Sequence, residues 1–335
     1  MRKSFVLLFI GLLGVILLSA CGQKSQDEVV NGLEKKVKEY TSYKATAKMV
    51  IETGEEPQEY KVEIWHKKPD YYRVYLENSK KDQHQVILRN GNGVFVLTPS
   101  LNKSFRFQSD WPTNSSQVYL FDSLVNDIKK DTEAEFSTNE ENYVFETKTN
   151  YQHNQSLPVQ EIVLNKKNLA PKSVKVMDTD RKEMVKVDFE KFAFDEPLEK
   201  ESFDEKKNMT LSHMDIATSA EASDDFAVAA PVYLPEGTEK LEEKEISTAD
   251  GKRIITTYGG KHSFTLIQEK ARVAQAAASV TASGNPVDLG FAIGALTDNS
   301  VSWTYDGVEY LLASDNIEQE ELVQIAKSVY GQSTK

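Results

Sequence analysis

Apolar and polar positions alternate along three successive segments in the first third of the chain. The apolar positions fall at every second residue, at Ala45, Ala47, Met49 and Ile51, at Tyr60, Val62 and Ile64, and at Tyr72, Val74 and Leu76. A period of two predicts strands with one apolar and one polar face, which is typical of an antiparallel sheet covered on one side. Turn-forming residues at 54–57, 68–70 and 90–93 separate these runs, so we predict a meander.

A period of three to four residues marks two other segments as amphipathic helices. The apolar stripes consist of Val30, Leu33, Val37 and Tyr40 in residues 27–40, and of Val118, Phe121, Leu124, Val125 and Ile128 in residues 116–130. Alternation resumes in further predicted strands at 143–147, 160–164, 172–177 and 183–189. A helix, a long meander, a second helix and more meander predict a curved sheet wrapped over helices.

Composition divides the chain into two units. Residues 212–230 are rich in Ser, Ala, Asp and Thr and poor in large apolar residues, which is typical of a linker. A length of 335 residues also exceeds the usual size of a single core. We therefore predict an N-terminal unit at 27–207, a linker at 208–229 and a smaller C-terminal α+β unit at 230–335.

The C-terminal unit is predicted to have paired strands around Gly259-Gly260, a hairpin about Asp306-Gly307 and a closing helix at 318–330. Trp303 and Tyr310 lie on that hairpin. They could form a binding face, but aromatic residues in strands more often pack in the core, here beneath the closing helix.

The N-terminus reads as a secretion signal. Arg2 and Lys3 precede the apolar run Phe5–Leu18, which is shorter than the roughly 20 residues that a membrane-spanning helix needs. The run ends in Leu18-Ser19-Ala20-Cys21, which looks like a bacterial lipobox, and Cys21 is the single cysteine of the chain. We predict that residues 1–20 are a lipoprotein signal peptide. The alternative is an ordinary secretory signal followed by a chance cysteine.

Lipidation of Cys21 implies a short tether at residues 21–26 and a protein held at the extracytoplasmic face of the cell membrane. One cysteine allows no internal disulfide, so the exported body depends on its core for stability. The formal net charge of −12 repels nucleic acid and anionic lipid headgroups. We therefore expect no nucleic-acid partner, and membrane contact through the lipid anchor alone.

Motifs for catalysis or metal binding are incomplete. Ser100-Leu101-Asn102-Lys103 and Ser314-Asp315-Asn316 match two motifs of penicillin-binding enzymes, but the serine follows Pro99 between strands and no Lys-Thr-Gly is present. The histidines are too widely spaced for a zinc site and are interpreted as surface residues, at His66, His84, His153, His213 and His262. We predict a protein that is not an enzyme and takes no metal or cofactor.

Two segments resemble the LolA-like lipoprotein-carrier superfamily. They are Lys68-Pro69-Asp70-Tyr71-Tyr72-Arg73-Val74 and the stretch from Asn90-Gly91-Asn92-Gly93 to Pro99, followed by Asn102-Lys103. Residues 161–164 and 192–197 resemble the closing strands of that superfamily. With the lipobox and the added C-terminal unit, the chain is similar to YdcC-type sporulation lipoproteins of endospore-forming bacteria. The resemblance implies an incomplete antiparallel β-barrel with a helical lid over an apolar cavity that receives acyl chains.

An anchored protein cannot shuttle as a soluble carrier does, and two functions remain open. In the first, the cavity binds an acyl chain or a lipidated protein without catalysis, through candidate residues Val62, Ile64, Tyr72, Val74, Leu76, Phe95, Leu97, Val118, Phe121 and Leu124. In the second, side chains fill the cavity and the chain binds an envelope or cell-wall protein as a regulatory or chaperone module. Both need the same apolar alternation, so the cavity volume decides between them.

Overall fold

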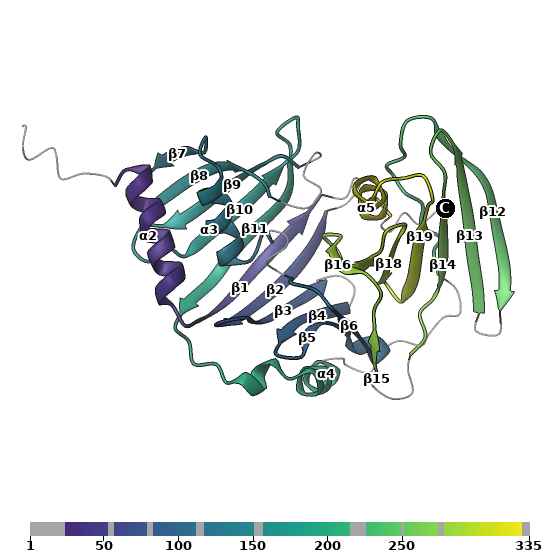
Figure 1. Ribbon diagram of the computed structural model, residues 1–335, viewed down its shortest axis with the longest axis horizontal. Coiled ribbons are helices and arrows are strands. Elements are labelled where there is room, and N and C mark those ends of the chain that lie inside the picture. Colours follow the sequence, from purple (N-terminus) through teal and green to yellow (C-terminus); the bar gives the residue numbers. More distant parts are fainter. Residues whose placement is uncertain are drawn as a thin grey trace, which may run out of the picture.

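The computed structural model describes residues 24–52, 57–78, 83–111, 117–150, 157–214, 226–248, 251–273 and 278–329. The described residues form two sheets that lie side by side, with helices packed on them (Figure 1). The predicted signal peptide and Cys21 lie outside these ranges.

The larger sheet has twelve strands in the order β15-β6-β5-β4-β3-β2-β1-β11-β10-β9-β8-β7. Its first strands are β1 (Ser42–Ile51), β2 (Gln58–Lys67), β3 (Tyr71–Asn78), β4 (Gln83–Asn90), β5 (Gly93–Thr98) and β6 (Lys103–Phe107). The others are β7 (Glu135–Thr138), β8 (Asn142–Lys148), β9 (Val159–Asn165), β10 (Pro171–Met177), β11 (Glu183–Phe194) and β15 (Ala278–Thr281). Neighbouring strands are antiparallel except β15, which pairs with β6 in parallel and comes from the C-terminal part of the chain.

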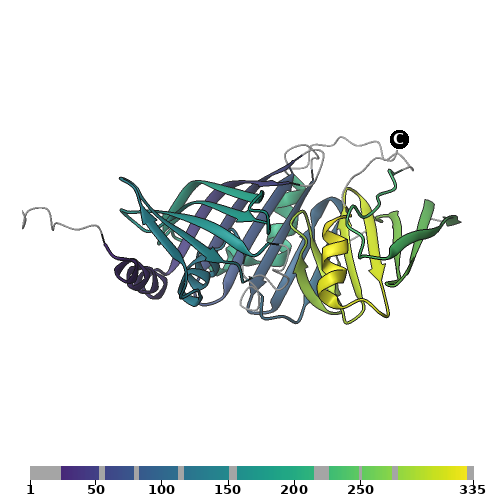
Figure 2. The same cartoon turned by 90° about the horizontal axis from the view of Figure 1, so that it is seen from above.

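Two helices lie on the same side of this curved sheet, α2 (Gln26–Glu39) and α3 (Phe121–Lys130) (Figure 2). Helix α2 starts at a capping box, in which Ser25 Oγ accepts from the Glu28 N–H at 3.3 Å and Glu28 Oε2 accepts from the Ser25 N–H at 2.8 Å. Helix α3 buries Phe121, Leu124 and Ile128 against the sheet. The end strands β15 and β7 do not pair with each other, so the sheet is open. The predicted α+β class, with an incomplete antiparallel barrel and a helical cover, is confirmed.

The opposite side of the sheet is covered in part by a third helix. Helix α4 (Glu205–Met214) follows the 3₁₀ turn η2 (Lys200–Phe203) and contacts β5 and the 3₁₀ turn η1 (Pro99–Leu101). The linker predicted at 208–229 therefore begins inside a helix. Residues 215–225 of that linker lie outside the described ranges.

The smaller sheet has seven strands in the order β12-β13-β14-β19-β18-β17-β16. Their bounds are β12 (Thr238–Thr248), β13 (Gly251–Gly260), β14 (Phe264–Lys270), β16 (Asn285–Asp288), β17 (Ile293–Leu296), β18 (Ser300–Tyr305) and β19 (Val308–Ala313). Helix α5 (Gln319–Lys327) packs on β18 and β19 and buries Leu322 and Ile325. Trp303 and Tyr310 are buried in the same core and stack at a centroid distance of 5.0 Å, as the packing alternative predicts.

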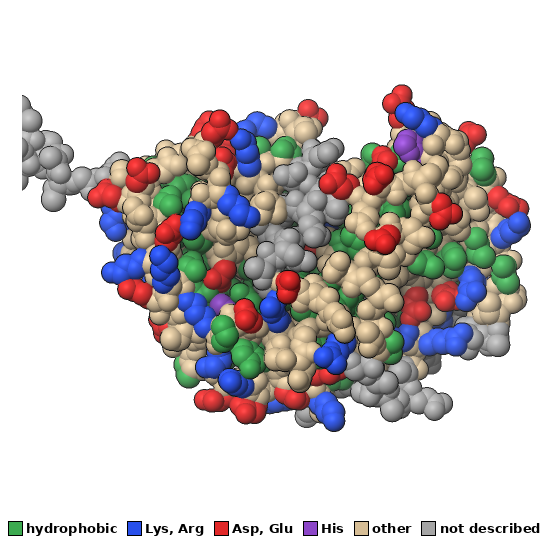
Figure 3. Space-filling view, viewed as in Figure 1, with side chains coloured by type: hydrophobic (Ala, Val, Ile, Leu, Met, Phe, Trp, Pro, Cys, Tyr) green, Lys and Arg blue, Asp and Glu red, His purple; other side chains and the backbone are tan. Residues whose placement is uncertain are grey.

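Charged side chains of both signs are interspersed over the face of the molecule seen in Figure 3. No helix within the described ranges is long and apolar enough to cross a membrane.

Candidate functional site

The predicted cavity residues of the meander meet the mid-chain helix on one side of the large sheet. They belong to a single apolar core, which contains Val62, Ile64, Tyr72, Val74, Leu76, Phe121 and Leu124, with Val118 packed against it. The pairing register explains this meeting, because Ile64 lies opposite Val74 and Val62 lies opposite Leu76 across β2 and β3. Paired residues point to the same face of a sheet, so alternation places all four toward α3.

This core is filled at its centre, beneath α3. Val62, Ile64, Val74 and Phe121 have 0% of their surface exposed, and Leu124 has 1%. A side chain without accessible surface borders no space as large as a water molecule, because such a space would itself be accessible. These side chains therefore contact one another and their neighbours instead of lining an open cavity.

Phe95 and Leu97 do not belong to this core, so their predicted position is wrong. They lie in a separate apolar cluster with Tyr75, Val86, Leu88 and Met209 of α4. Strand β5 is covered on both faces, so each residue from Val94 to Thr98 is buried. Alternation cannot identify the inward face of such a strand. Helix α4, which covers the other face, was not predicted, because most of it lies in the segment predicted to be a linker.

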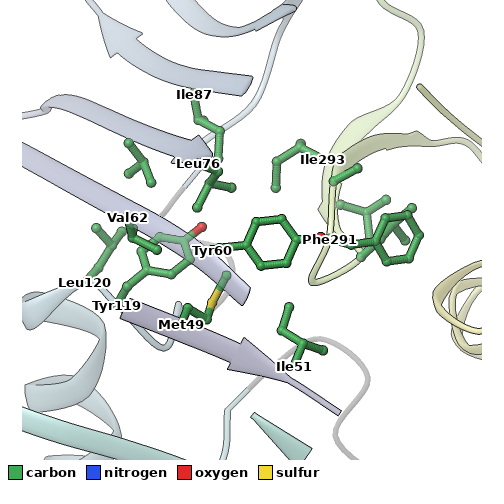
Figure 4. Close-up of a cluster of buried hydrophobic side chains, with 14 of the residues drawn as sticks. Met49, Ile51, Tyr60, Val62, Leu76, Ile87, Tyr119, Leu120, Phe291 and Ile293 are labelled. Atoms are coloured by element: carbon green, nitrogen blue, oxygen red, sulfur yellow. The ribbon is translucent and has the colours of Figure 1, made fainter. Parts of the chain in front are cut away.

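A second set of side chains, three of them apolar and one polar, lies where the two sheets meet. We call it the mouth, and define it as Ile51, Tyr60, Leu76 and Gln85, which β1, β2, β3 and β4 supply. The turn between β16 and β17 lies against it, with the ring of Tyr60 directed toward Phe291 and with Ile293 near Leu76 (Figure 4). Ile51, Tyr60 and Leu76 are 9%, 3% and 5% exposed, so the turn covers them.

Polar contacts surround this apolar contact. The main-chain N–H of Ile293 donates to Gln85 Oε1 at 3.1 Å, and the Tyr305 hydroxyl donates to Gln58 Oε1 at 2.7 Å. Lys103 of β6 pairs with Glu309 of β19. A cavity of about 30 Å³ remains between the two sheets, which is room for about one water molecule.

The mouth was not predicted from the sequence. One available signal was the apolar run Leu289-Gly290-Phe291-Ala292-Ile293, which is unusual for a turn between short strands. A turn so apolar is expected to lie against another apolar surface. The partner surface lies at the ends of strands far away in the sequence, 208 residues away for Gln85 and Ile293, and has no local signature.

A buried polar cluster joins α2, β2 and α3 at the other end of the sheet. The Tyr40 hydroxyl lies 2.7 Å from Asp122 Oδ1, 2.6 Å from Asp122 Oδ2 and 3.0 Å from His66 Nδ1. Burial, followed by the charge of Lys68, lowers the pKa of His66 to about 3. Burial raises the pKa of Asp122, although the hydrogen bond from Tyr40 opposes this. His66 and Tyr40 are each 1% exposed, and the Asp122 side chain is 29% exposed. The cluster therefore ties the helices to the sheet, with its hydroxyl and imidazole closed to a substrate.

The interpretation of His66 and His84 as surface residues is therefore wrong. His66 is stacked on Tyr72 at 4.1 Å, and His84 is 6% exposed beside Tyr75. Both imidazole rings pack on aromatic neighbours. The spacing of the histidines along the sequence does not show which of them are packed in this way. His153 and the side chain of His213 lie outside the described residues.

Among the described residues, no group of three or more His, Cys, Asp and Glu side chains has the arrangement of a metal site. Ser100 is the exposed residue of the turn η1, and Lys103 is paired with Glu309, so the lysine is not a free base for that serine. Neither arrangement indicates catalysis.

Comparisons with known proteins identify relatives. The family described as "Sporulation protein YdcC-like" matches residues 2–203. A curated relative from Bacillus subtilis (strain 168), "Sporulation protein YdcC", is 70% identical over 334 residues, which cover 100% of this chain and 99% of the relative.

The solved structures that match this chain are less similar to it in sequence. An uncharacterised conserved protein from Thermus thermophilus matches with a TM-score of 0.38 and 13% identity, over 54% of this chain and 93% of that chain. The MucA/MucB complex of Pseudomonas aeruginosa gives a TM-score of 0.33 and 15% identity, over 89% and 96% of the two chains. A LolA superfamily protein from Nitrosomonas europaea gives 0.30 and 12%, over 53% and 98%. No function is carried over from structures at these scores.

Proposed function

This chain belongs to the YdcC-like family of sporulation proteins, and we propose that it acts in sporulation as a non-catalytic, protein-binding module. In this proposal a lipid on Cys21 holds the body at the extracytoplasmic face of the cell membrane. Two acyl chains at that cysteine provide stable anchoring, because each buried CH₂ contributes about 0.8 kcal/mol. The partner is then a protein of the cell envelope or cell wall.

One observation carries the choice of a protein over a lipid ligand, namely the filled core beneath α3. An acyl chain in the apolar cavity needs space beside Val62, Ile64 and Val74, and these side chains have no accessible surface. Making that space requires helix α3 to leave the sheet, which exposes Phe121 and Leu124 to water. Exposing a large apolar side chain costs about 1.5 to 3 kcal/mol each, so the filled core opposes uptake of a lipid.

The polar clusters support binding without catalysis. Tyr40, His66 and Asp122 have the residue types of an acid–base set, but the hydroxyl and the imidazole are buried and bonded to each other. A general base must reach the proton that it abstracts in a bound substrate. The cluster is instead suited to fix the helices that cover the sheet.

The proposal is tested with the soluble body, residues 24–335, purified from the native organism and from a heterologous host. Lipids are extracted from both preparations and measured by mass spectrometry, and candidate envelope proteins captured by the body are purified and mixed with it. We expect no stoichiometric lipid, and a one-to-one complex with one purified protein in size-exclusion chromatography. A bound acyl lipid near one per chain, with no such complex, would establish lipid binding instead.

A further inference from the structure

We propose that the mouth is a binding site for an apolar peptide segment of the partner protein, and that the turn at residues 289–293 occupies this site from within the same chain. This inference rests on the proposed function and names the surface that it uses. The chain then holds its own ligand, and a partner segment must displace it.

The turn fills the mouth as a ligand would. Leu289, Phe291 and Ala292 are 3%, 5% and 2% exposed, although they lie in a turn between two strands of four residues each, and Ile293, the first residue of β17, is 5% exposed. Figure 4 shows Ile293 facing Leu76 and the ring of Tyr60 directed at the turn, and the Phe291 ring packs on Tyr305 at a centroid distance of 4.8 Å. Aromatic and branched side chains inserted into an apolar pocket are the usual anchors of a peptide interface.

The backbone of the turn is shaped for this contact. Asp288 Oδ1 accepts the N–H of Gly290 at 2.7 Å, and the Leu289 N–H donates to the Ala292 carbonyl at 2.9 Å. Gly290 has a φ of +88°, and a Cβ atom there would lie 3.4 Å from Ile51 Cδ1. A glycine therefore suits both the left-handed backbone and the close approach to β1.

A polar contact at the mouth identifies the ligand as a peptide. Gln85 Oε1 accepts the main-chain N–H of Ile293, so the mouth binds a backbone amide as well as apolar side chains. An acyl chain supplies no N–H to this oxygen, and its binding would leave the amide of Gln85 without that hydrogen bond. Peptide ligands that combine main-chain hydrogen bonds with side-chain pockets are recognised in this way.

Contacts outside the mouth hold the occupying turn in place. Tyr305 bonds to Gln58, and Glu309 pairs with Lys103, and both contacts join the small sheet to the large one. A second segment cannot enter while the turn is docked, because both use the same side chains. The apparent affinity for a partner segment is then lowered by the small fraction of chains in which the turn is released.

The test measures binding of a labelled peptide with the chain's own sequence from Val287 to Ala295, by fluorescence anisotropy. Phe291→Asp in the soluble body should release the turn, because a carboxylate cannot remain in an apolar pocket. We expect this variant to bind the peptide about tenfold or more tighter than the wild-type body. A second change in the same background, Leu76→Asp, should abolish binding.

Two further measurements keep the test decisive if Phe291→Asp does not fold. Tyr305→Phe combined with Glu309→Gln weakens docking without changing the turn or the mouth, and should also raise peptide affinity. Gln85→Ala in either released background should lower peptide affinity about fivefold, the effect of one lost hydrogen bond, and should leave binding of a fluorescent fatty acid unchanged. Circular dichroism and cooperative unfolding establish that each variant is folded.

Each outcome either supports the inference or overturns a stated part of it. Peptide binding that is stronger in the released variants and lost with Leu76→Asp supports the inference. Equal binding to wild-type and released chains overturns the competition by the turn, and absence of binding to every folded variant overturns the mouth as a site. Fatty-acid binding without peptide binding overturns the ligand class. None of these outcomes depends on the one-to-one complex that tests the proposed function. The inference about the mouth and the proposed function can therefore fail separately.

Discussion

Gln58 Oε1 accepts a hydrogen bond from the hydroxyl of Tyr305 at 2.7 Å, and this contact joins strand β2 of the large sheet to strand β18 of the small one. The same oxygen also accepts from the Tyr60 hydroxyl at 2.5 Å. Both tyrosine rings belong to the apolar core that is continuous between the two sheets. One amide side chain therefore satisfies two hydroxyl groups at the junction.

Replacing this amide should loosen the junction. Gln58→Ala removes the acceptor that the hydroxyl groups of Tyr60 and Tyr305 share, and we expect a loss of about 1 to 3 kcal/mol in the free energy of unfolding. Urea unfolding followed by tryptophan fluorescence measures it. Glu59→Gln on the next residue is the matched control, because its ion pair with Lys48 is exposed and should contribute less than about 1 kcal/mol. A similar stability for both variants would show that the bond is unimportant.

The filled core makes a distinct prediction for Val74. A carboxylate at this position, 0% exposed, has no partner and no water, so Val74→Asp should unfold the chain instead of emptying a binding site. Circular dichroism and the elution volume in size-exclusion chromatography report the loss of fold. Val232→Asp, at a position that is 55% exposed, should keep the native spectrum. A folded Val74→Asp variant would show that space exists beside this side chain.

Some features were predictable from sequence because they are local. The alternation of Val62, Ile64, Val74 and Leu76 predicts a buried face, and the structure places all four in one core. Phe95 and Leu97 were misplaced because β5 is buried on both sides, and a period of two does not tell one side from the other. The mouth could not be predicted, because Gln85 and Ile293 meet only through the docking of two sheets. Whether a core is filled or hollow depends on packing that alternation does not encode.

His66 should make the chain sensitive to acid. Burial lowers its pKa from 6.5 to about 3, so the unfolded chain takes up a proton on this residue at a pH where the folded chain does not. The stability that the neutral imidazole contributes is complete above pH 6.5 and is lost as the pH falls toward 3, by about 3 kcal/mol between pH 7 and pH 4. Asp122 acts in the opposite sense, because burial raises the pKa of its carboxyl group.

A comparison of variants isolates the contribution of His66. His66→Gln removes the titrating group, so its free energy of unfolding should fall less than that of the wild type between pH 7 and pH 4. His262→Gln, at a partly buried histidine in the turn between β13 and β14, is the matched control. Parallel curves for His66→Gln and the wild type would show that another group governs the acid response.

The division into two units predicts the response to proteolysis. We expect limited digestion to cut first between residues 212 and 230, and each resulting unit to unfold cooperatively when it is produced alone. The C-terminal unit alone should bind a dye specific for apolar surface more strongly than the intact body does, because Ile293 loses its cover from the large sheet. A first cut elsewhere, or units that do not unfold cooperatively, would contradict the division.

Cys21 decides where the protein resides. Its position after Leu18-Ser19-Ala20 predicts that a diacylglycerol is attached to its sulfur and that residues 1–20 are removed. Cys21→Ala should therefore move the body from the membrane pellet to the soluble extracytoplasmic fraction, or leave an unprocessed chain that is longer by its signal. Gln23→Ala, two residues beyond the cysteine, keeps the lipobox and should remain in the pellet. Mass spectrometry of the N-terminal peptide should find an acylated cysteine in Gln23→Ala and in the wild type. A processed Cys21→Ala chain that still pellets with the membrane, and withstands a salt wash, would show that the protein is held there by something other than this lipid.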